Sequence, residues 1–196
     1  MELAEKATVP VINALDDIEH PCQVAADLLT IKEHKKSFNG LKLAYIGDGN
    51  NVCNSLALGA ALVGMDFVAA TPLEYRPDPG ILKSAASLAR EKGVSSEVTA
   101  SPEEAAKGAD IIYTDTWVSM GQECEAQKKE RILKPYQITE GLMARANKDC
   151  LFMHCLPAHR GMEVTEGVID GPRSVVFDQA ENRMHAQKAI LLQLMA

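Results

Sequence analysis

The chain has 196 residues, 46% of them hydrophobic, which is enough to bury the core of one large domain. Its formal net charge of −7 argues against nucleic acid or an anionic membrane surface as a partner. Five cysteines, an odd set without framework spacing, suit a reducing compartment. No apolar run approaches the roughly 20 residues of a membrane span, and we expect a cytoplasmic protein.

Short β-rich runs alternate with helical segments, a pattern typical of a parallel α/β sheet. The first half of the chain predicts three strands and three helices in alternation. The strands are expected at 9–13, 41–46 and 67–70, and the helices at 21–36, 52–63 and 80–92. Pro21 suits a first helical turn, because the N–H that proline lacks would be unpaired there.

The second half predicts strands at 96–99, 110–114 and 150–154, with a helix start at Ser101-Pro102. A long polar loop is expected through residue 130, and helical turns at 139–147. A short strand or extended piece at 175–177 and a terminal helix at 179–195 complete the pattern. The fold class is therefore α/β, a Rossmann-like doubly wound sheet of about five parallel strands flanked by helices.

Polar residues gather after three of the predicted strands. These clusters are 47–51, 115–121 and 154–161, and the last contains a thiol between two imidazoles, His154-Cys155-Leu156-Pro157-Ala158-His159-Arg160. Ligands of doubly wound sheets bind just beyond the carboxyl ends of the strands. The three clusters are therefore the candidate site.

The Gly47-Asp48-Gly49 turn invites a dinucleotide-binding interpretation, but the fingerprint fails. The third glycine should stand at Val52, where a branched side chain blocks close packing of helix and strand. No acid for a ribose follows the strand at 67–70 either. We expect no cofactor, and interpret the glycines as a tight turn that presents Asn51 and nearby N–H groups to an anion.

Cys155 admits three interpretations. It could be a small buried hydrophobe, as most free cysteines are. Alternatively, His154, His159 and Arg160 could favour a thiolate. In the third interpretation, His154, Cys155 and His159 could bind zinc, but a CxxC or HExxH partner is lacking, so we expect no metal.

Two charged residues extend the candidate site. Asp115 closes an apolar strand and could face the same crevice as Cys155, a combination suited to a small cationic amine. Arg183 is expected in the first turn of the terminal helix, where its charge opposes the helix dipole. An arginine there indicates a bound anion or a salt bridge.

Taken together, these clusters resemble the ornithine carbamoyltransferases, enzymes with a carbamoyl-phosphate domain and an ornithine domain. Six co-linear motifs carry the resemblance across essentially the whole chain. They are Val9-Pro10-Val11-Ile12-Asn13-Ala14-Leu15, His20-Pro21-Cys22-Gln23, Gly47-Asp48-Gly49-Asn50-Asn51, Thr114-Asp115-Thr116-Trp117-Val118-Ser119-Met120-Gly121-Gln122-Glu123, His154-Cys155-Leu156-Pro157 and Phe177-Asp178-Gln179-Ala180-Glu181-Asn182-Arg183. The Ser119-Met120-Gly121 loop resembles ornithine enzymes more than putrescine ones, and the aspartate enzymes lack the thiol loop and recognise a second carboxylate with basic residues.

The resemblance implies a carbamoyl transfer from carbamoyl phosphate to L-ornithine, giving L-citrulline and phosphate. It implies that His20, Gln23 and Arg183 bind the carbamoyl group. It also implies an ornithine site formed by Asn51, Asp115, Ser119, Met120 and Leu156. The implied catalytic residues are Cys155, Arg183 and His20.

The resemblance further implies a division of the chain into three parts. Residues 1–37 correspond to the end of the carbamoyl-phosphate domain and an inter-domain helix, and residues 38–178 to the ornithine domain. Residues 179–196 form a helix that packs back on the first domain. A complementing first domain or a homo-oligomer is an expected partner.

The family's Ser-Thr-Arg-Thr phosphate loop has no counterpart in these residues. Without that helix N-terminus and its arginine, the phosphate group loses its principal binding site. We therefore expect a truncated ornithine-binding half that is inactive or very weak on its own. The alternative is a non-catalytic amino-acid-binding domain of the same fold.

Overall fold

The computed structural model describes residues 2–118 and 126–195. Five parallel strands form one sheet in the order β3-β2-β1-β4-β5. They are β1 (Lys42–Ile46), β2 (Asp66–Ala70), β3 (Ser96–Thr99), β4 (Ile111–Thr114) and β5 (Leu151–His154). This confirms the predicted doubly wound sheet. The order reverses between β1 and β4, and the point where their carboxyl ends meet, called the crevice below, is where doubly wound sheets bind ligands.

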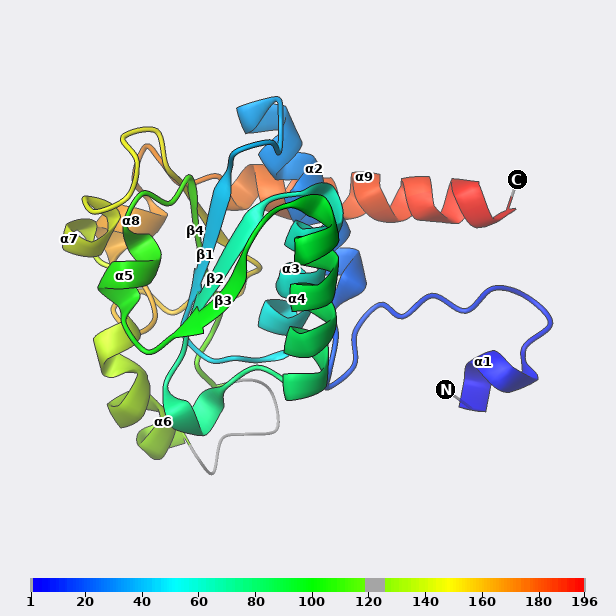
Figure 1. The fold of residues 1–196 in the computed structure, drawn as a ribbon, viewed down its shortest axis with the longest axis horizontal. Coiled ribbons are helices and arrows are strands. Elements are labelled where there is room, and N and C mark those ends of the chain that lie inside the picture. Colours follow the sequence, from blue (N-terminus) through cyan, green and yellow to red (C-terminus); the bar gives the residue numbers. More distant parts are fainter. Residues whose placement is uncertain (1, 119–125, 196) are drawn as a thin grey trace.

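Helices cover both faces of the sheet (Figure 1). One side carries α2 (Pro21–Lys35), α3 (Asn51–Val63), α4 (Pro79–Lys92) and α9 (Val176–Met195), and α9 packs along α2. The other side carries α5 (Pro102–Ala106), α7 (Glu140–Met143) and α8 (Glu166–Ile169). Shorter pieces are α1 (Glu2–Lys6), α6 (Ala126–Leu133), η1 (Leu73–Tyr75) and η3 (Lys134–Tyr136). The end of α9 and the segment bearing α1 extend away from the body.

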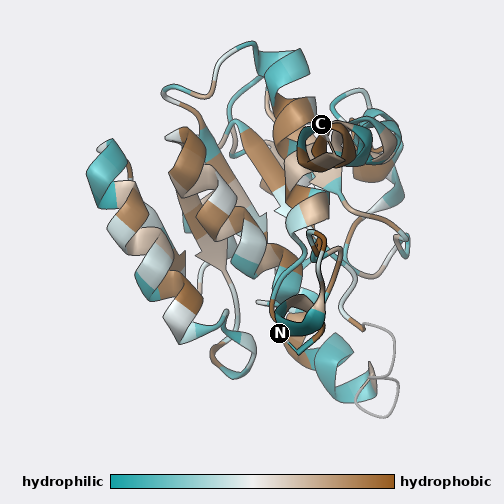
Figure 2. Cartoon of the chain, turned by 90° about the vertical axis from the view of Figure 1, so that its right-hand side faces the viewer, coloured by the Kyte–Doolittle hydropathy of each residue, from teal (hydrophilic) through white to brown (hydrophobic). Residues whose placement is uncertain are grey.

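The core divides into two layers, because successive side chains of a strand point to opposite faces. Leu43, Tyr45 and Tyr113 pack towards α2 and α3. Ala44 and Ile112 pack towards α5 and α7 on the other side. Figure 2 shows the hydrophobic strands between helices whose outer faces are hydrophilic.

Helix α3 begins at the crevice, and local chemistry fixes where it starts. The Asn50 side chain caps it by accepting hydrogen bonds from Val52 N and Cys53 N at 3.1 and 3.2 Å. Further along, Gly59 lets α2 approach, because a Cβ there would lie 2.5 Å from Val24 Cγ1. Gly64, with φ of 78°, ends the helix in the left-handed region.

Three predicted segments are wrong. Residues 9–13 form no strand, and Val9 and Val11 are exposed, so nothing in the sheet pairs with them. The loop predicted through residue 130 gives way to α6 at Ala126. Residues 175–177 are not a strand, because α9 starts at Val176; the pairing with β5 is limited to an isolated bridge between Ser174 and Phe152, where Val175 N donates to Phe152 O at 3.1 Å. Arg183 is consequently well inside the helix rather than in its first turn.

Within the described part of the chain, no helix is both long and apolar enough to cross a membrane.

Candidate active site

Asp115 is the centre of the crevice between β1 and β4. Its Oδ2 accepts a hydrogen bond from Asn50 Nδ2 at 2.6 Å, and its Oδ1 accepts from Thr116 N at 2.7 Å. The Cys155 thiol, which follows β5, donates to the same Oδ1 at 2.9 Å. Asp115 and Cys155 thus share one crevice, as the sequence predicts. A buried carboxylate held by neutral donors is suited to binding a cationic amine.

Cys155 is not placed to form a thiolate. Its pKa is raised well above the usual value, because the thiol is desolvated and faces the Asp115 carboxylate. The expected cationic neighbour points elsewhere: Arg160 pairs with Asp170 at 2.7 Å on the surface. The thiolate interpretation is therefore wrong, and Cys155 is a protonated donor to Asp115.

We predict that Cys155 reacts slowly with iodoacetamide at neutral pH, because the thiolate is the reacting form. Mass spectrometry of the alkylated chain over pH 6–10 would measure this site by site. The rate at Cys155 should keep rising above pH 9. A rate that reaches its plateau near pH 7 would contradict the protonated-donor description.

The glycine turn after β1 borders Asp115 on its other side. Gly47 has φ of 142°, in the region that favours glycine. A Cβ at Gly49 would lie 2.4 Å from Pro77 N, so only glycine fits there. The turn directs Asn50, not Asn51, to Asp115, because Asn51 Nδ2 donates instead to Asp16 O at 2.7 Å. Nothing in the sequence distinguished the two asparagines.

A buried ion pair supports the same turn. Lys129 Nζ of α6 donates to Asp48 Oδ2 at 2.5 Å, and both side chains are less than 9% exposed. The ammonium also lies 5.0 Å from the centre of the Tyr75 ring. This pair was not predicted, because 126–130 was interpreted as loop.

A second group of candidate residues lies where α2 meets α9. Arg183 Nη1 donates to Gln23 Oε1 at 2.5 Å. When the side-chain amide of Gln187, one turn further along α9, is oriented with its oxygen towards Arg183, that oxygen accepts from Arg183 Nη2 and Nε at 2.9 and 3.1 Å. Among the described residues, Arg183 forms no ion pair within 4 Å, so two neutral amides hold its charge.

His20 connects the two groups electrostatically. It is the N-cap residue of α2, and its backbone N–H donates to Ser55 Oγ at 2.8 Å. Its pKa is lowered by burial and then by Arg183, while Asp115 acts in the opposite direction. The ring is therefore largely neutral at pH 7. His20 Nδ1 is buried and has no hydrogen-bond partner in the described part of the chain.

The Cys155-Leu156 loop is held from behind by a buried histidine. Leu156 has a positive φ of 57°, and its N–H donates to His154 Nδ1 at 2.9 Å. The other ring nitrogen of His154 lies 3.4 Å from Glu163 Oε1. Glu163 Oε1 also accepts from His159 N. Ser119 and Met120, the other predicted ornithine contacts, lie outside the described residues.

Asp115, His154 and Cys155 have potential ligand atoms within 4.8 Å of one another. His159, the third member of the zinc interpretation, lies instead beside Thr116 and Glu163. A metal ion would have to displace the Leu156 N–H from His154 and the thiol from Asp115. The three side chains are engaged with protein partners, so they do not form a ready metal site.

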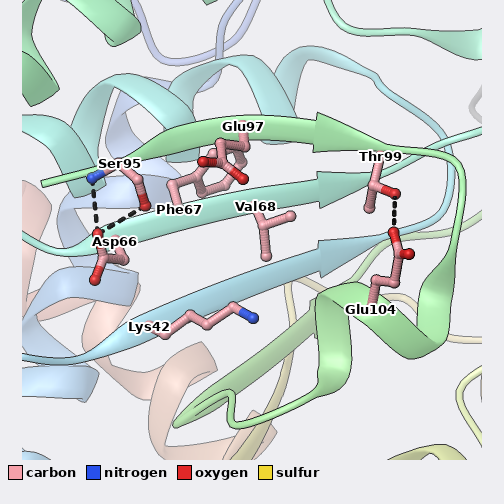
Figure 3. A pocket seen from close by; sticks show the side chains of 8 residues that line it. All are labelled: Lys42, Asp66, Phe67, Val68, Ser95, Glu97, Thr99 and Glu104. Atoms are coloured by element: carbon pink, nitrogen blue, oxygen red, sulfur yellow. Dashed lines mark hydrogen bonds between the residues drawn. The ribbon is translucent and has the colours of Figure 1, made fainter.

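A cavity of about 310 Å³ lies away from this crevice, on the face of the sheet beside α5 (Figure 3). Its polar residues are largely engaged: Asp66 accepts from Ser95, and Glu104 accepts from Thr99 Oγ1 at 2.9 Å. Lys42 Nζ donates to Lys107 O at 2.9 Å. None of the predicted site residues lines this cavity.

The fold and the strand-end residues together define an α/β domain with its polar side chains gathered at the switch point of a parallel sheet, where domains of this class bind ligands. The chain belongs to the aspartate/ornithine carbamoyltransferase family. The model of that family's Asp/Orn binding domain matches residues 39–194, and the model of its carbamoyl-P binding domain matches residues 1–33.

Individual relatives agree with this assignment. The chain is 54% identical over 196 residues to an ornithine carbamoyltransferase of Picrophilus torridus, and 52% identical to a catabolic one of Thermoplasma acidophilum. All of this chain is covered, but only 65% and 64% of those relatives.

Solved structures agree as well. The ornithine carbamoyltransferase of Pyrococcus furiosus superposes with a TM-score of 0.93 at 54% identity, over 97% of this chain and 61% of that one. The enzyme of Gloeobacter violaceus gives 0.92 at 49% identity, over 100% and 65%. The chain thus spans less than two thirds of the proteins it matches.

Proposed function

We propose that this chain provides the ornithine-binding half of an ornithine carbamoyltransferase, which converts carbamoyl phosphate and L-ornithine to L-citrulline and phosphate. The observation that carries the proposal is the cluster after β4 and β5, where the buried Asp115 carboxylate accepts from Asn50 Nδ2 at 2.6 Å and from the Cys155 thiol at 2.9 Å. Asp115 suits the α-amino group of ornithine, and Cys155, which follows the neighbouring strand, would lie beside its side-chain amine. Arg183 and Gln23, joined by a hydrogen bond where α2 meets α9, are the groups proposed for the carbamoyl side.

The chemistry assigned to the residues follows their charge. The side-chain amine of ornithine attacks the carbamoyl carbon, the new C–N bond forms, and the bond from carbon to the phosphate oxygen breaks. Arg183 and His20 would donate to the oxyanion that develops on the carbonyl, with Gln23 orienting the carbamoyl group. Cys155 and the Leu156 carbonyl would face the attacking amine, which must reach the carbon without its extra proton.

The remaining contacts proposed for ornithine are with its α-amino and α-carboxylate groups. We assign them to Asn51, Asp115, Ser119 and Met120, as the family motif implies. Asn50 joins this set on the observed contact with Asp115. The proposed parts of the chain are the end of a carbamoyl-phosphate domain (1–37), the ornithine domain (38–178) and a helix that packs on the first domain (179–196).

We predict that the 196-residue chain on its own forms citrulline far more slowly than the roughly 1–1000 per second of ordinary enzymes. Lys129 is paired with Asp48 and His20 is neutral, so a phosphate dianion would face Arg183 with little further cationic support from the described residues around the crevice. A colorimetric citrulline assay would measure the rate. Turnover above about 1 per second would contradict the prediction.

Ligand selectivity tests the proposed function. Isothermal titration of the chain with ornithine, putrescine and aspartate should show ornithine binding most tightly. Putrescine lacks an α-carboxylate, and aspartate lacks the side-chain amine that Cys155 and the Leu156 carbonyl would face. Equal affinity for all three ligands, or no binding of any of them, would mean that the crevice is not an ornithine site. Ornithine binding without turnover on addition of a carbamoyl-phosphate domain would favour a non-catalytic binding module.

A further inference from the structure

Asp27 is a wholly buried carboxylate on α2 that takes no part in the proposed transfer reaction. Three side chains donate to it. Gln23 Nε2 and Gln179 Nε2 reach its Oδ1 at 2.8 and 2.7 Å, and the Tyr113 hydroxyl reaches its Oδ2 at 3.1 Å. Asp27 therefore joins α2 to α9 and to β4.

A carboxylate determines which way a neighbouring amide turns, because an ionised carboxylate can only accept hydrogen bonds. Gln23 must present its NH₂ group to Asp27, and its oxygen then faces Arg183 Nη1 at 2.5 Å. Gln179 is oriented in the same way, and its oxygen accepts from His154 N at 3.0 Å. Asp27 thus fixes the orientation of two side-chain amides. The Gln23 oxygen points to Arg183, and the Gln179 oxygen points to the backbone N–H of His154.

Packing alone does not account for an acid at this position. Burial raises the pKa of Asp27 to about 7, against the opposing effect of its three donors and Arg183. A neutral or apolar side chain of similar size would avoid that desolvation cost. The acceptor-only character of the carboxylate is what a neutral residue could not supply.

We propose that Asp27 is a positioning residue for the carbamoyl side of the site. It fixes the Gln23 amide with the oxygen towards Arg183 and so holds the guanidinium in place. The functional part of this inference rests on the proposed function, which assigns the carbamoyl group to Gln23 and Arg183. Asp27 itself touches no substrate.

Asp27→Asn removes the constraint while conserving shape. An asparagine offers both a donor and an acceptor, so Gln23 can turn its NH₂ group towards Arg183 and displace the guanidinium. Glu33→Gln is the matched control, because Glu33 also lies on α2 and accepts from an amide of α9, Asn182, at 2.7 Å. Tyr113→Phe is a second control, since it removes the donor to Oδ2 and leaves the Gln23 contact to Oδ1.

NMR couplings transmitted through hydrogen bonds would report the orientation directly, at pH 8 where Asp27 is largely ionised. We expect wild type, Glu33→Gln and Tyr113→Phe to show couplings from Gln23 Nε2 to the Asp27 carboxyl carbon, and from Arg183 Nη1 to the Gln23 amide carbon. Asp27→Asn should lose the second. If that variant does not fold, the wild-type pattern still decides. A wild type with Gln23 turned the other way, or a folded Asp27→Asn that keeps the Arg183 coupling, would overturn the proposal.

Affinity for ¹³C-labelled carbamoyl phosphate, read from the same samples, distinguishes positioning from mere structural support. Asp27→Asn should weaken it at least about tenfold, and both controls should leave it unchanged. A folded Asp27→Asn with wild-type affinity would overturn the proposed positioning role. Absence of binding by the wild type would contradict the assignment of the carbamoyl group to Gln23 and Arg183, but not the proposed ornithine site, and the couplings would still decide whether Asp27 orients Gln23.

Discussion

Replacing Asp48 with alanine is expected to destabilise the fold by about 3–5 kcal/mol, because it leaves the Lys129 ammonium buried without its carboxylate. Lys129 Nζ lies 2.5 Å from Asp48 Oδ2, and the side chains of Asp48 and Lys129 are 8% and 5% exposed. Urea unfolding followed by circular dichroism would measure the loss.

Two further variants make that experiment specific. Asp149→Ala removes a carboxylate that pairs with Lys35 at 2.7 Å but is 79% exposed, and it should cost much less. The double variant Asp48→Asn/Lys129→Met should recover part of the stability, because it removes the unpaired charge. If Asp48→Ala and Asp149→Ala proved equally mild, the buried pair would not support the turn after β1 as described.

Replacing Asp115 with asparagine is expected to weaken ornithine binding by about 10- to 150-fold, the effect of a lost charged hydrogen bond. The carboxylate is the acceptor shared by Asn50 and Cys155, and an amide of the same shape has no charge with which to attract an ammonium. Isothermal titration would measure the affinity. Cys155 should also become more reactive, since the Asp115 charge contributes to its raised pKa.

Asp110→Asn is the control for that substitution. Asp110 directly precedes β4, whereas Asp115 directly follows it. The Asp110 carboxylate accepts from Asn147 Nδ2 at 2.7 Å. This variant should bind ornithine as the wild type does. Equal affinity of Asp115→Asn and wild type, with both folded, would remove Asp115 from the amine site.

The buried Asp27 carboxyl also predicts how stability depends on pH. Its pKa is raised to about 7 from an ordinary value of 3.8, so the folded chain keeps this proton over a window in which the unfolded chain has lost it. Stability should therefore fall by a few kcal/mol as pH rises from about 4 to 7. Asp27→Asn should lack this component, which appears as the difference between the two urea-unfolding curves. Parallel pH dependence of the two proteins would contradict it.

The sequence predicted the sheet and the helices of its central part well, because their signals are local. The prolines at helix starts, the Ser101 cap and the short β-rich runs each specify an element without distant contacts. Residues 9–13 and 175–177 are rich in strand-forming residues, but a strand needs a partner. Such pairing depends on tertiary structure, which periodicity alone does not encode.

The site shows the same division. The sequence brought Asp115 and Cys155 to one crevice, because parallel strand ends lie at one edge of the sheet. It could not assign the protonation state of Cys155, which depends on burial beside Asp115 and on Arg160 pairing away with Asp170. Asp27 carried no signal, since a single acid in an amphipathic helix is indistinguishable from a solvated one until α9 covers it.

The central claim is that the crevice between β1, β4 and β5 binds ornithine. Titrating the isotope-labelled chain with ornithine and following its backbone amides by NMR tests this most directly. We expect weak binding, millimolar or weaker, equivalent to no more than about 4 kcal/mol. Shifts should concentrate at Gly47–Asn50, Asp115–Thr116 and Cys155–Leu156. Saturating ornithine that leaves these amides unmoved, or that shifts instead the Ser95–Thr99 edge beside the cavity of Figure 3, would contradict the claim.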